Sequence, residues 1–176
     1  MFWVKFVTNF LKILRAGQTP RQIAGAFALG AVVGLSPALT LQGVIVWLII
    51  FVLDVNLSAA FFAYGTFALI AYIFDPIFHS FGYFLLIDVT ALHAFWTFLY
   101  NAPIAPLSRF YNTVVLGSFV SGVILSVPVY FGMKHFVIAY RAHIHTKVER
   151  WKIYQILNRS SLIKWYQRVR SLGVQP

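Results

Sequence analysis

The sequence lacks cysteine and is poor in charged residues. Charged side chains make up 10% of its 176 residues, against about 25% in soluble globular chains. Without cysteine, disulfides, zinc–thiolate sites and iron–sulfur clusters are excluded. The 14 basic and four acidic side chains are also too few to cover the surface of a soluble domain of this size.

Apolar residues, in contrast, are abundant. They account for 60% of the chain, phenylalanine alone occurs 18 times, and the mean hydropathy is +0.79. These values indicate that the chain resides in a lipid bilayer. We predict an all-α integral membrane protein in three parts: an amphipathic helix at 1–16, a transmembrane domain at 20–140, and a basic amphipathic tail at 141–176.

The basic residues are concentrated at the two ends of the chain. Residues 1–21 hold four of them and no acid, 134–176 hold nine against Glu149, and the region between has a net charge of −2. By the positive-inside bias, both termini are predicted to be cytoplasmic. The basic residues flank apolar segments and form no recognised nucleic-acid motif, so we predict no nucleic-acid partner. No cleavable signal peptide is evident.

Both ends of the chain contain amphipathic helical patterns. Residues 2–15 place basic and polar side chains on one face and aromatic side chains on the other, which favours a helix lying among anionic lipid headgroups. Packing of this helix on the protein itself requires the same pattern. Leu162–Leu172 is similar, with docking onto a partner protein as its alternative. The predicted headgroup contacts are Lys5, Lys12, Arg15, Arg21, Lys164 and Arg168.

The apolar core is interrupted at short intervals. Ile23–Leu35 ends at Ser36-Pro37, and Ala38–Leu53 ends before Asn56. Both fall short of the roughly 20 residues that cross a bilayer. Short apolar segments joined at a proline predict a re-entrant helical hairpin, whose broken backbone must be buried by neighbouring helices.

Three further apolar segments follow. Leu57–Phe74 ends at Asp75-Pro76, a second predicted break. Ile77–Tyr100 and Phe110–Met133 are long enough to cross the bilayer. Cytoplasmic termini require an even number of crossings. Two crossings with re-entrant hairpins, or four tilted crossings, both satisfy this condition, and we favour the first.

One set of motifs follows a family pattern. Gly30 and Gly34 with Leu35 and Pro37 form G-xxx-G-(L/F)-x-P, a spacing that by itself favours close helix packing. Asn56 then opens the next segment, and Asp75-Pro76 and Gly82 complete the order. The stretch Ala24–Leu86 thus resembles a bacterial family of small inner-membrane domains of unknown function. It departs from that family at Asp75, where asparagine is usual. The resemblance implies a helical protein of the bacterial inner membrane.

Ionisable residues within the apolar run call for an explanation, because placing each of them in the bilayer costs several kcal/mol on insertion scales. Asp75 and His79 are four residues apart and would face each other on a helix, as a structural pair or a helix cap. Asp88 points the opposite way. The candidate functional or packing residues are Gly30, Gly34, Ser36, Pro37, Asn56, Asp75, Pro76, His79 and Asp88. We predict no catalytic residue, metal or cofactor.

Two prolines that interrupt apolar segments favour a transport-like function, because broken helices line midplane sites in transporters. The sequence predicts a non-enzymatic component that transfers or translocates phospholipid. Membrane phospholipids and a larger protein with a periplasmic domain are its predicted partners. A structural anchor or assembly subunit, and a small ion- or proton-coupled transporter, are the alternatives.

Overall fold

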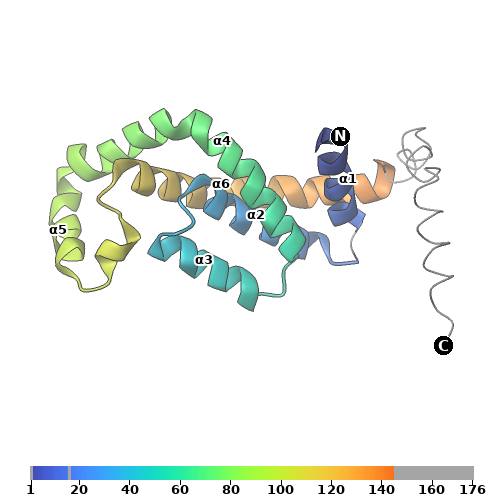
Figure 1. Ribbon diagram of the computed structural model, residues 1–176, viewed down its shortest axis with the longest axis horizontal. Helices are drawn as coiled ribbons and strands as arrows, with labels where there is room; N and C mark the ends of the chain where they lie inside the picture. Colours follow the sequence, from blue (N-terminus) through green and yellow to red (C-terminus); the bar gives the residue numbers. More distant parts are fainter. Residues whose placement is uncertain (1, 16, 145–176) are drawn as a thin grey trace. The chain divides into compact units, whose positions relative to one another are not determined.

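The computed structural model describes residues 2–15 and 17–144, and the side chains of 7–14 and 17–142 (Figure 1). The predicted tail with Lys164 and Arg168 therefore lies outside the described residues. The chain divides into two compact units, Met1–Val137 and Ile138–Pro176. Among the described residues of the first unit, all regular secondary structure is helical, as predicted. In the second, α6 ends at Ala139 and the π-helix Tyr140–Ile144 follows it.

The α-helices are α1 (Phe2–Arg15), α2 (Pro20–Leu35), α3 (Leu41–Val52), α4 (Leu57–Tyr83), α5 (His93–Asn101) and α6 (Thr113–Ala139). A π-helical turn, Phe84–Asp88, continues α4, and two 3₁₀ turns, Thr90–Leu92 and Ala105–Ser108, flank α5.

Polar side chains define where the helices begin. Thr19 forms a capping box with Gln22, and Pro20 takes the first helical position of α2, where its missing N–H leaves no bond unmade. Asn56 is buried and caps α4, its side-chain oxygen accepting a 2.8 Å hydrogen bond from the Ala59 backbone N–H. A hydrogen bond of 2.7 Å from the Gln22 amide nitrogen to Asp54 joins the start of α2 to the loop before α4.

α2 lies against the first half of α4, and the two helices run in the same direction. A Cβ built at Gly30 would collide with the carbonyl oxygen of Ala60. One at Gly34 would lie 2.6 Å from the carbonyl oxygen of Tyr64. The two backbones meet directly, which is the approach that this glycine spacing favours.

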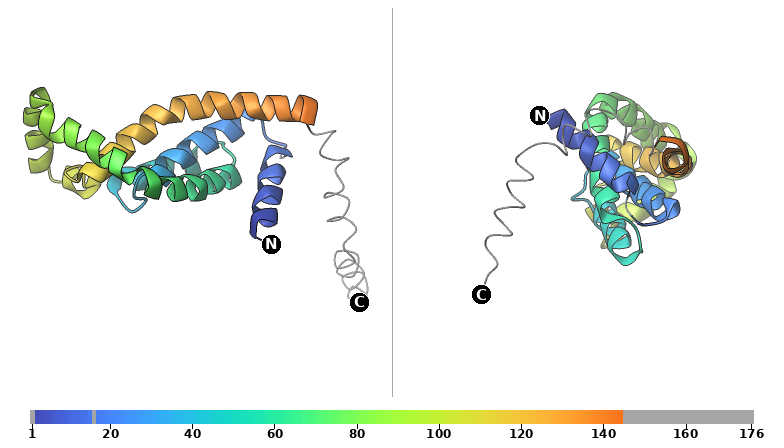
Figure 2. Two further views of the ribbon diagram at one scale, coloured as in Figure 1. Left: turned by 90° about the horizontal axis from the view of Figure 1, so that it is seen from above. Right: turned by 90° about the vertical axis from the view of Figure 1, so that its right-hand side faces the viewer.

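α6 completes the bundle through two further glycines. Gly117 of α6 lies against the backbone of Phe78 in α4, and Gly122 lies beside Val32 of α2. The left view of Figure 2 shows α2 between α4 and α6. Since Gly117 precedes Gly122, α6 passes the second half of α4 before it reaches α2.

The second half of α1 packs on this bundle. Phe10 stacks on Phe62 of α4 with ring centroids 5.1 Å apart and on Phe136 of α6 at 6.0 Å. Ile13 and Leu14 are buried. The alternative of a helix packed on the protein itself therefore holds for these three α1 residues. Aromatic residues of α4 and α6 supply their apolar partner, and the position of α1 among lipid headgroups stays a prediction.

The predicted break at Asp75-Pro76 is wrong. α4 continues through Pro76, and it is bowed in Figure 1, as an internal proline produces. The helix continues because Phe78 and Gly82, just beyond the proline, are buried where α4 packs on α6. Burial of this turn offsets the lost backbone hydrogen bond.

The predicted span Ile77–Tyr100 is also not one helix. The π-helical turn ends at Asp88, and α5 folds back toward it. Trp96 donates its indole N–H to the carbonyl oxygen of Leu85 at 2.9 Å, and His93 donates to that of Ile87 at 2.9 Å. These bonds satisfy carbonyl groups left free at the helix end.

Two helical segments are long and apolar enough to cross a membrane: Leu57–Asp88, with 32 residues, and Thr113–Ala142, with 30. The second corresponds to the predicted span Phe110–Met133. α2 and α3 are shorter, with 16 and 12 residues, and form a helical hairpin (Figure 1).

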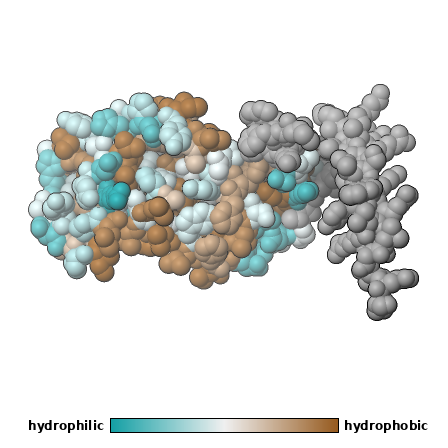
Figure 3. All heavy atoms as spheres, viewed as in Figure 1, coloured by the Kyte–Doolittle hydropathy of each residue, from teal (hydrophilic) through white to brown (hydrophobic). Residues whose placement is uncertain are grey.

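Large apolar side chains also cover much of the molecular surface. On α3, Leu48, Phe51 and Val52 are all exposed, and Figure 3 shows hydrophobic surface over this helix. Such a continuous apolar surface marks contact with lipid or with another protein.

Candidate functional site

The turn of the α2–α3 hairpin opens on a cavity of about 260 Å³, which we call the Asp75 cavity. Ser36 and Pro37 line it from the turn, Tyr72 and Asp75 from α4, and Ser118 from α6. The two proline-containing motifs of the sequence therefore meet at one place, although only the first of them interrupts a helix.

Local chemistry explains why α2 stops at this cavity. Ser36 precedes a proline, which disfavours helical backbone, and it adopts an extended conformation with φ −108° and ψ 159°. Its hydroxyl donates a 2.8 Å hydrogen bond to the Val32 carbonyl oxygen. Thr40 donates to the Pro37 carbonyl oxygen at 2.8 Å and caps α3 by accepting from the Gly43 N–H at 3.3 Å. The turn thus supplies many of its own hydrogen bonds, as a turn surrounded by apolar residues must.

The Asp75 cavity is rich in hydrogen-bond acceptors. Asp75 is partly buried, and no basic side chain lines the cavity among the described residues. The hydroxyl of Ser118 donates to the Val115 carbonyl oxygen at 3.2 Å, as that of Ser36 does within α2. Both serines thus use their hydroxyl protons within their own helices, which leaves Asp75 as the charged group described at the cavity. The cavity is therefore suited to cations, ammonium groups, water and protons.

The predicted pairing of Asp75 with His79 does not appear among the described hydrogen bonds. His79 instead shares a hydrogen bond of 2.7 Å between its Nδ1 atom and the Thr113 hydroxyl, which links α4 to the start of α6. The helical spacing correctly placed the two residues on one face, but the partner comes from another helix. Asp88 is exposed at the end of the π-helical turn.

The described residues contain no group of three or more histidine, cysteine, aspartate or glutamate side chains that could hold a metal ion.

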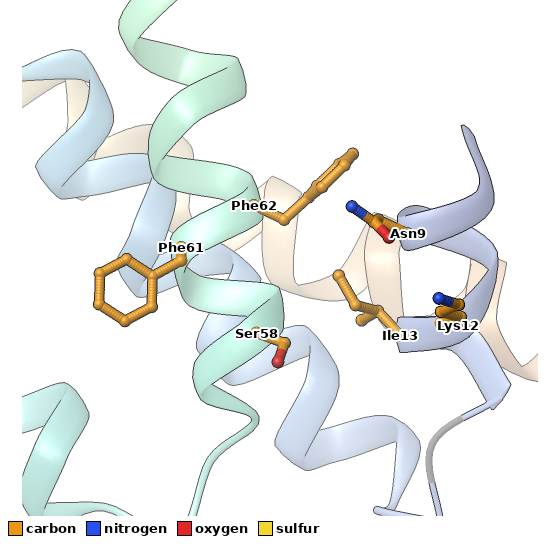
Figure 4. Close-up of a pocket in the computed structure, with 6 residues that line it drawn as sticks. All are labelled: Asn9, Lys12, Ile13, Ser58, Phe61 and Phe62. Atoms are coloured by element: carbon orange, nitrogen blue, oxygen red, sulfur yellow. The ribbon is translucent and has the colours of Figure 1, made fainter. Parts of the chain in front are cut away.

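A second cavity, of about 450 Å³, lies between α1 and α4, and we call it the Lys12 cavity. Figure 4 shows the residues that line it, three from α1 and three from α4: Asn9, Lys12, Ile13, Ser58, Phe61 and Phe62. Sequence reasoning singled out Lys12 but not its α4 neighbours. Only the fold brings them together, since α1 and α4 are separated by two intervening helices.

Three other predicted headgroup contacts lie on α1 and α2. Arg21 is exposed in the first turn of α2. Lys5 and Arg15 lie on α1, and their side chains are not among those described.

These observations define a helical protein with two segments long enough to span a membrane and a hairpin packed against them. The family model described as "Uncharacterized protein conserved in bacteria (DUF2062)" matches residues 5–145. The chain belongs to this family. The prediction of a bacterial family without an assigned activity is confirmed, and the match extends well beyond the stretch Ala24–Leu86.

A relative from Treponema pallidum (strain Nichols), itself named "Uncharacterized protein", is 26% identical over 161 residues. The aligned region covers 92% of this chain and 99% of the relative. No solved structure matches the chain.

Proposed function

We propose that this chain is an integral protein of the bacterial inner membrane that translocates phospholipid without catalysing a reaction. Leu57–Asp88 and Thr113–Ala142 are its two crossings, and the α2–α3 hairpin is re-entrant. The single observation that carries the proposal is the Asp75 cavity, in which the hairpin turn and the middle of a membrane-length helix meet.

The depth of the hairpin turn in the bilayer is inferred from the α4 residues that lie beside α2. α2 begins near Val55, which lies 3.8 Å from a Cβ built at Gly25, and it runs beside α4 as far as Tyr64. The turn then shares a cavity with Asp75, which is close to the midpoint of the 32-residue segment Leu57–Asp88. If that segment crosses the bilayer, the turn lies near the midplane. A helix of 16 residues is only about 24 Å long, too short for a hydrocarbon core of about 30 Å.

The same packing supports termini on one side of the membrane. Phe10 of α1 contacts Phe136 near the end of α6 and Phe62 near the start of α4. The start of α6, at Thr113, lies instead against Gly82 near the far end of α4. With the positive-inside bias, the shared side is the cytoplasm.

In this arrangement the carboxylate of Asp75 interacts with lipid headgroups. A carboxylate at mid-membrane is costly and marks a path for polar substrates or protons. The Asp75 cavity supplies acceptor groups that can hold water and the ammonium of a passing headgroup. The apolar surface of α3 beside it accommodates acyl chains. A larger partner with a periplasmic domain would receive the lipid, which gives the exchange a direction.

The test is lipid scrambling in vesicles that contain the purified full-length chain. The probe is phosphatidylethanolamine labelled on an acyl chain, which keeps its headgroup ammonium; a membrane-impermeant reductant destroys the label in the inner leaflet only if lipid exchanges between leaflets. We expect exchange with the unmodified chain and roughly tenfold slower exchange with Asp75→Asn, which corresponds to an increase of ~1.4 kcal/mol in the barrier. Asp88→Asn is the matched control, because it removes an exposed carboxylate outside the cavity. Exchange no faster than in protein-free vesicles would overturn the proposal.

A second candidate is proton- or cation-coupled transport. It is favoured by one observation, a partly buried carboxylate in a cavity with no basic neighbour among the described residues. In the same vesicles, with a pH-sensitive dye inside, this candidate predicts flux driven by a proton gradient that Asp75→Asn abolishes. Lipid exchange without such flux would exclude it.

A further inference from the structure

The Lys12 cavity combines one cationic side chain with neutral polar groups and aromatic rings. Its volume of about 450 Å³ falls in the range of roughly 300–1,000 Å³ that is typical of small-molecule sites. Two sequence-distant helices build it, with Asn9 and Lys12 on one side and Ser58 on the other (Figure 4). It is separate from the Asp75 cavity and shares no lining residue with it.

The polar groups of this cavity select for an anion. Lys12 brings an ammonium group with three donors, Asn9 an amide N–H₂ and Ser58 a hydroxyl. None of the described lining residues is acidic. Phosphate oxygens accept hydrogen bonds from donors of all three kinds, and the phosphate charge complements that of Lys12.

The remaining walls are apolar, which distinguishes a lipid from a free anion. Ile13 is only 7% exposed, and Phe62 is held by its stacking on Phe10. Phe61 is half exposed, and its ring points away from α1 (Figure 4) and lies 4.8 Å from that of Trp47 in α3. A soluble anion gains nothing from such walls, whereas the glycerol and upper acyl chains of a phospholipid bury apolar area against them.

We propose that the Lys12 cavity is a binding site for an anionic phospholipid. Its phosphate lies against Lys12, Asn9 and Ser58, and its acyl chains lie along Ile13 and Phe62. The site anchors α1, and with it the start of α4, at the lipid interface. This proposal relies on the membrane location proposed above but not on lipid translocation.

The proposal is tested by native mass spectrometry of the full-length chain in detergent. The protein is titrated with phosphatidylglycerol and with phosphatidylcholine of the same acyl chains. We expect phosphatidylglycerol to bind more tightly and Lys12→Gln to weaken its binding about tenfold, as the loss of one charge-assisted contact would. Ser58→Ala should weaken it by a smaller factor. Lys134→Gln is the matched control: it removes the same charge from α6, outside the cavity, and should leave the affinity unchanged.

Two results would overturn the proposal. Equal weakening by Lys12→Gln and Lys134→Gln would show diffuse attraction rather than a site. Displacement of the lipid by inorganic phosphate at a comparable concentration would show a site for free phosphate and not for lipid. Circular dichroism of both variants checks that the substitutions leave the helices intact. Lipid binding without scrambling would contradict the proposed function alone, so the two failures are distinguishable.

Discussion

The backbone of Gly30 in α2 lies directly against the carbonyl oxygen of Ala60 in α4, with no space for a side chain between the two helices. Four residues later the same approach recurs between Gly34 and Tyr64. These contacts fix how far α2 extends along α4. They therefore also fix the position of Pro37, which follows at the Asp75 cavity.

Gly30→Ala should destabilise the protein. The added methyl group would overlap the Ala60 carbonyl oxygen and force the helices apart, at a cost of about 1–3 kcal/mol. The thermal unfolding midpoint in detergent should fall. Gly65→Ala on α4 is the control, because a Cβ there meets nothing within 4 Å. Alanine is the better helix former by about 0.5–1 kcal/mol, so this variant should be as stable as the parent or more so. Changes of the same sign and size in both variants would contradict the proposed contact.

The re-entrant hairpin predicts a labelling pattern for single cysteines. The chain has no cysteine of its own, so each variant carries one thiol. An impermeant maleimide should reach Asp54→Cys from the cytoplasmic face and Ile104→Cys from the periplasmic face. Leu39→Cys, in the hairpin turn and 93% exposed in the isolated chain, should not react from the periplasmic face, because the turn ends near the midplane. Four full crossings would instead bring Leu39→Cys and Ile104→Cys to the same side, and their labelling would then agree.

Local signals define the two ends of α2 and its close contact with another helix. Thr19 and Pro20 begin α2, and Ser36-Pro37 ends it, because capping and the steric effect of proline act within a few residues. The glycine spacing at Gly30 likewise indicated a close helix contact. Each of these features depends on the identity of a few adjacent side chains, so the sequence alone is sufficient to locate them.

The second half of the fold depends on contacts that no local pattern reports. Pro76 resembles Pro37 in sequence, yet α4 continues through it because the next turn is buried against α6. The partner of His79 is Thr113, far along the chain. The same reason explains why Ser58 was missed at the Lys12 cavity: only tertiary packing brings it next to α1.

Trp96→Phe should loosen the segment between α4 and α5. Phenylalanine keeps the ring that stacks on Phe110 at 5.7 Å but loses the donor to the Leu85 carbonyl oxygen. The cost should be about 1 kcal/mol, and hydrogen exchange should accelerate over residues 84–92. Trp47→Phe is a matched control, since Trp47 makes ring contacts with Phe61 and Tyr64 but no described hydrogen bond. Unchanged exchange over residues 84–92 in Trp96→Phe would show that the indole N–H contributes nothing to this segment.

The bond between His79 and Thr113 should be measurable as a coupling energy between α4 and α6. His79→Ala and Thr113→Val each remove the 2.7 Å contact between Nδ1 and the hydroxyl. The double variant should lose less stability than the two single losses added together, with a difference of about 0.5–1.5 kcal/mol. Equilibrium unfolding in mixed micelles of increasing SDS content gives the four free energies. The pair Ser126→Ala and Thr113→Val is the control, because Ser126 donates only within α6, to the Val123 carbonyl oxygen. Strict additivity for His79 and Thr113 would mean that the contact does not hold the two helices together.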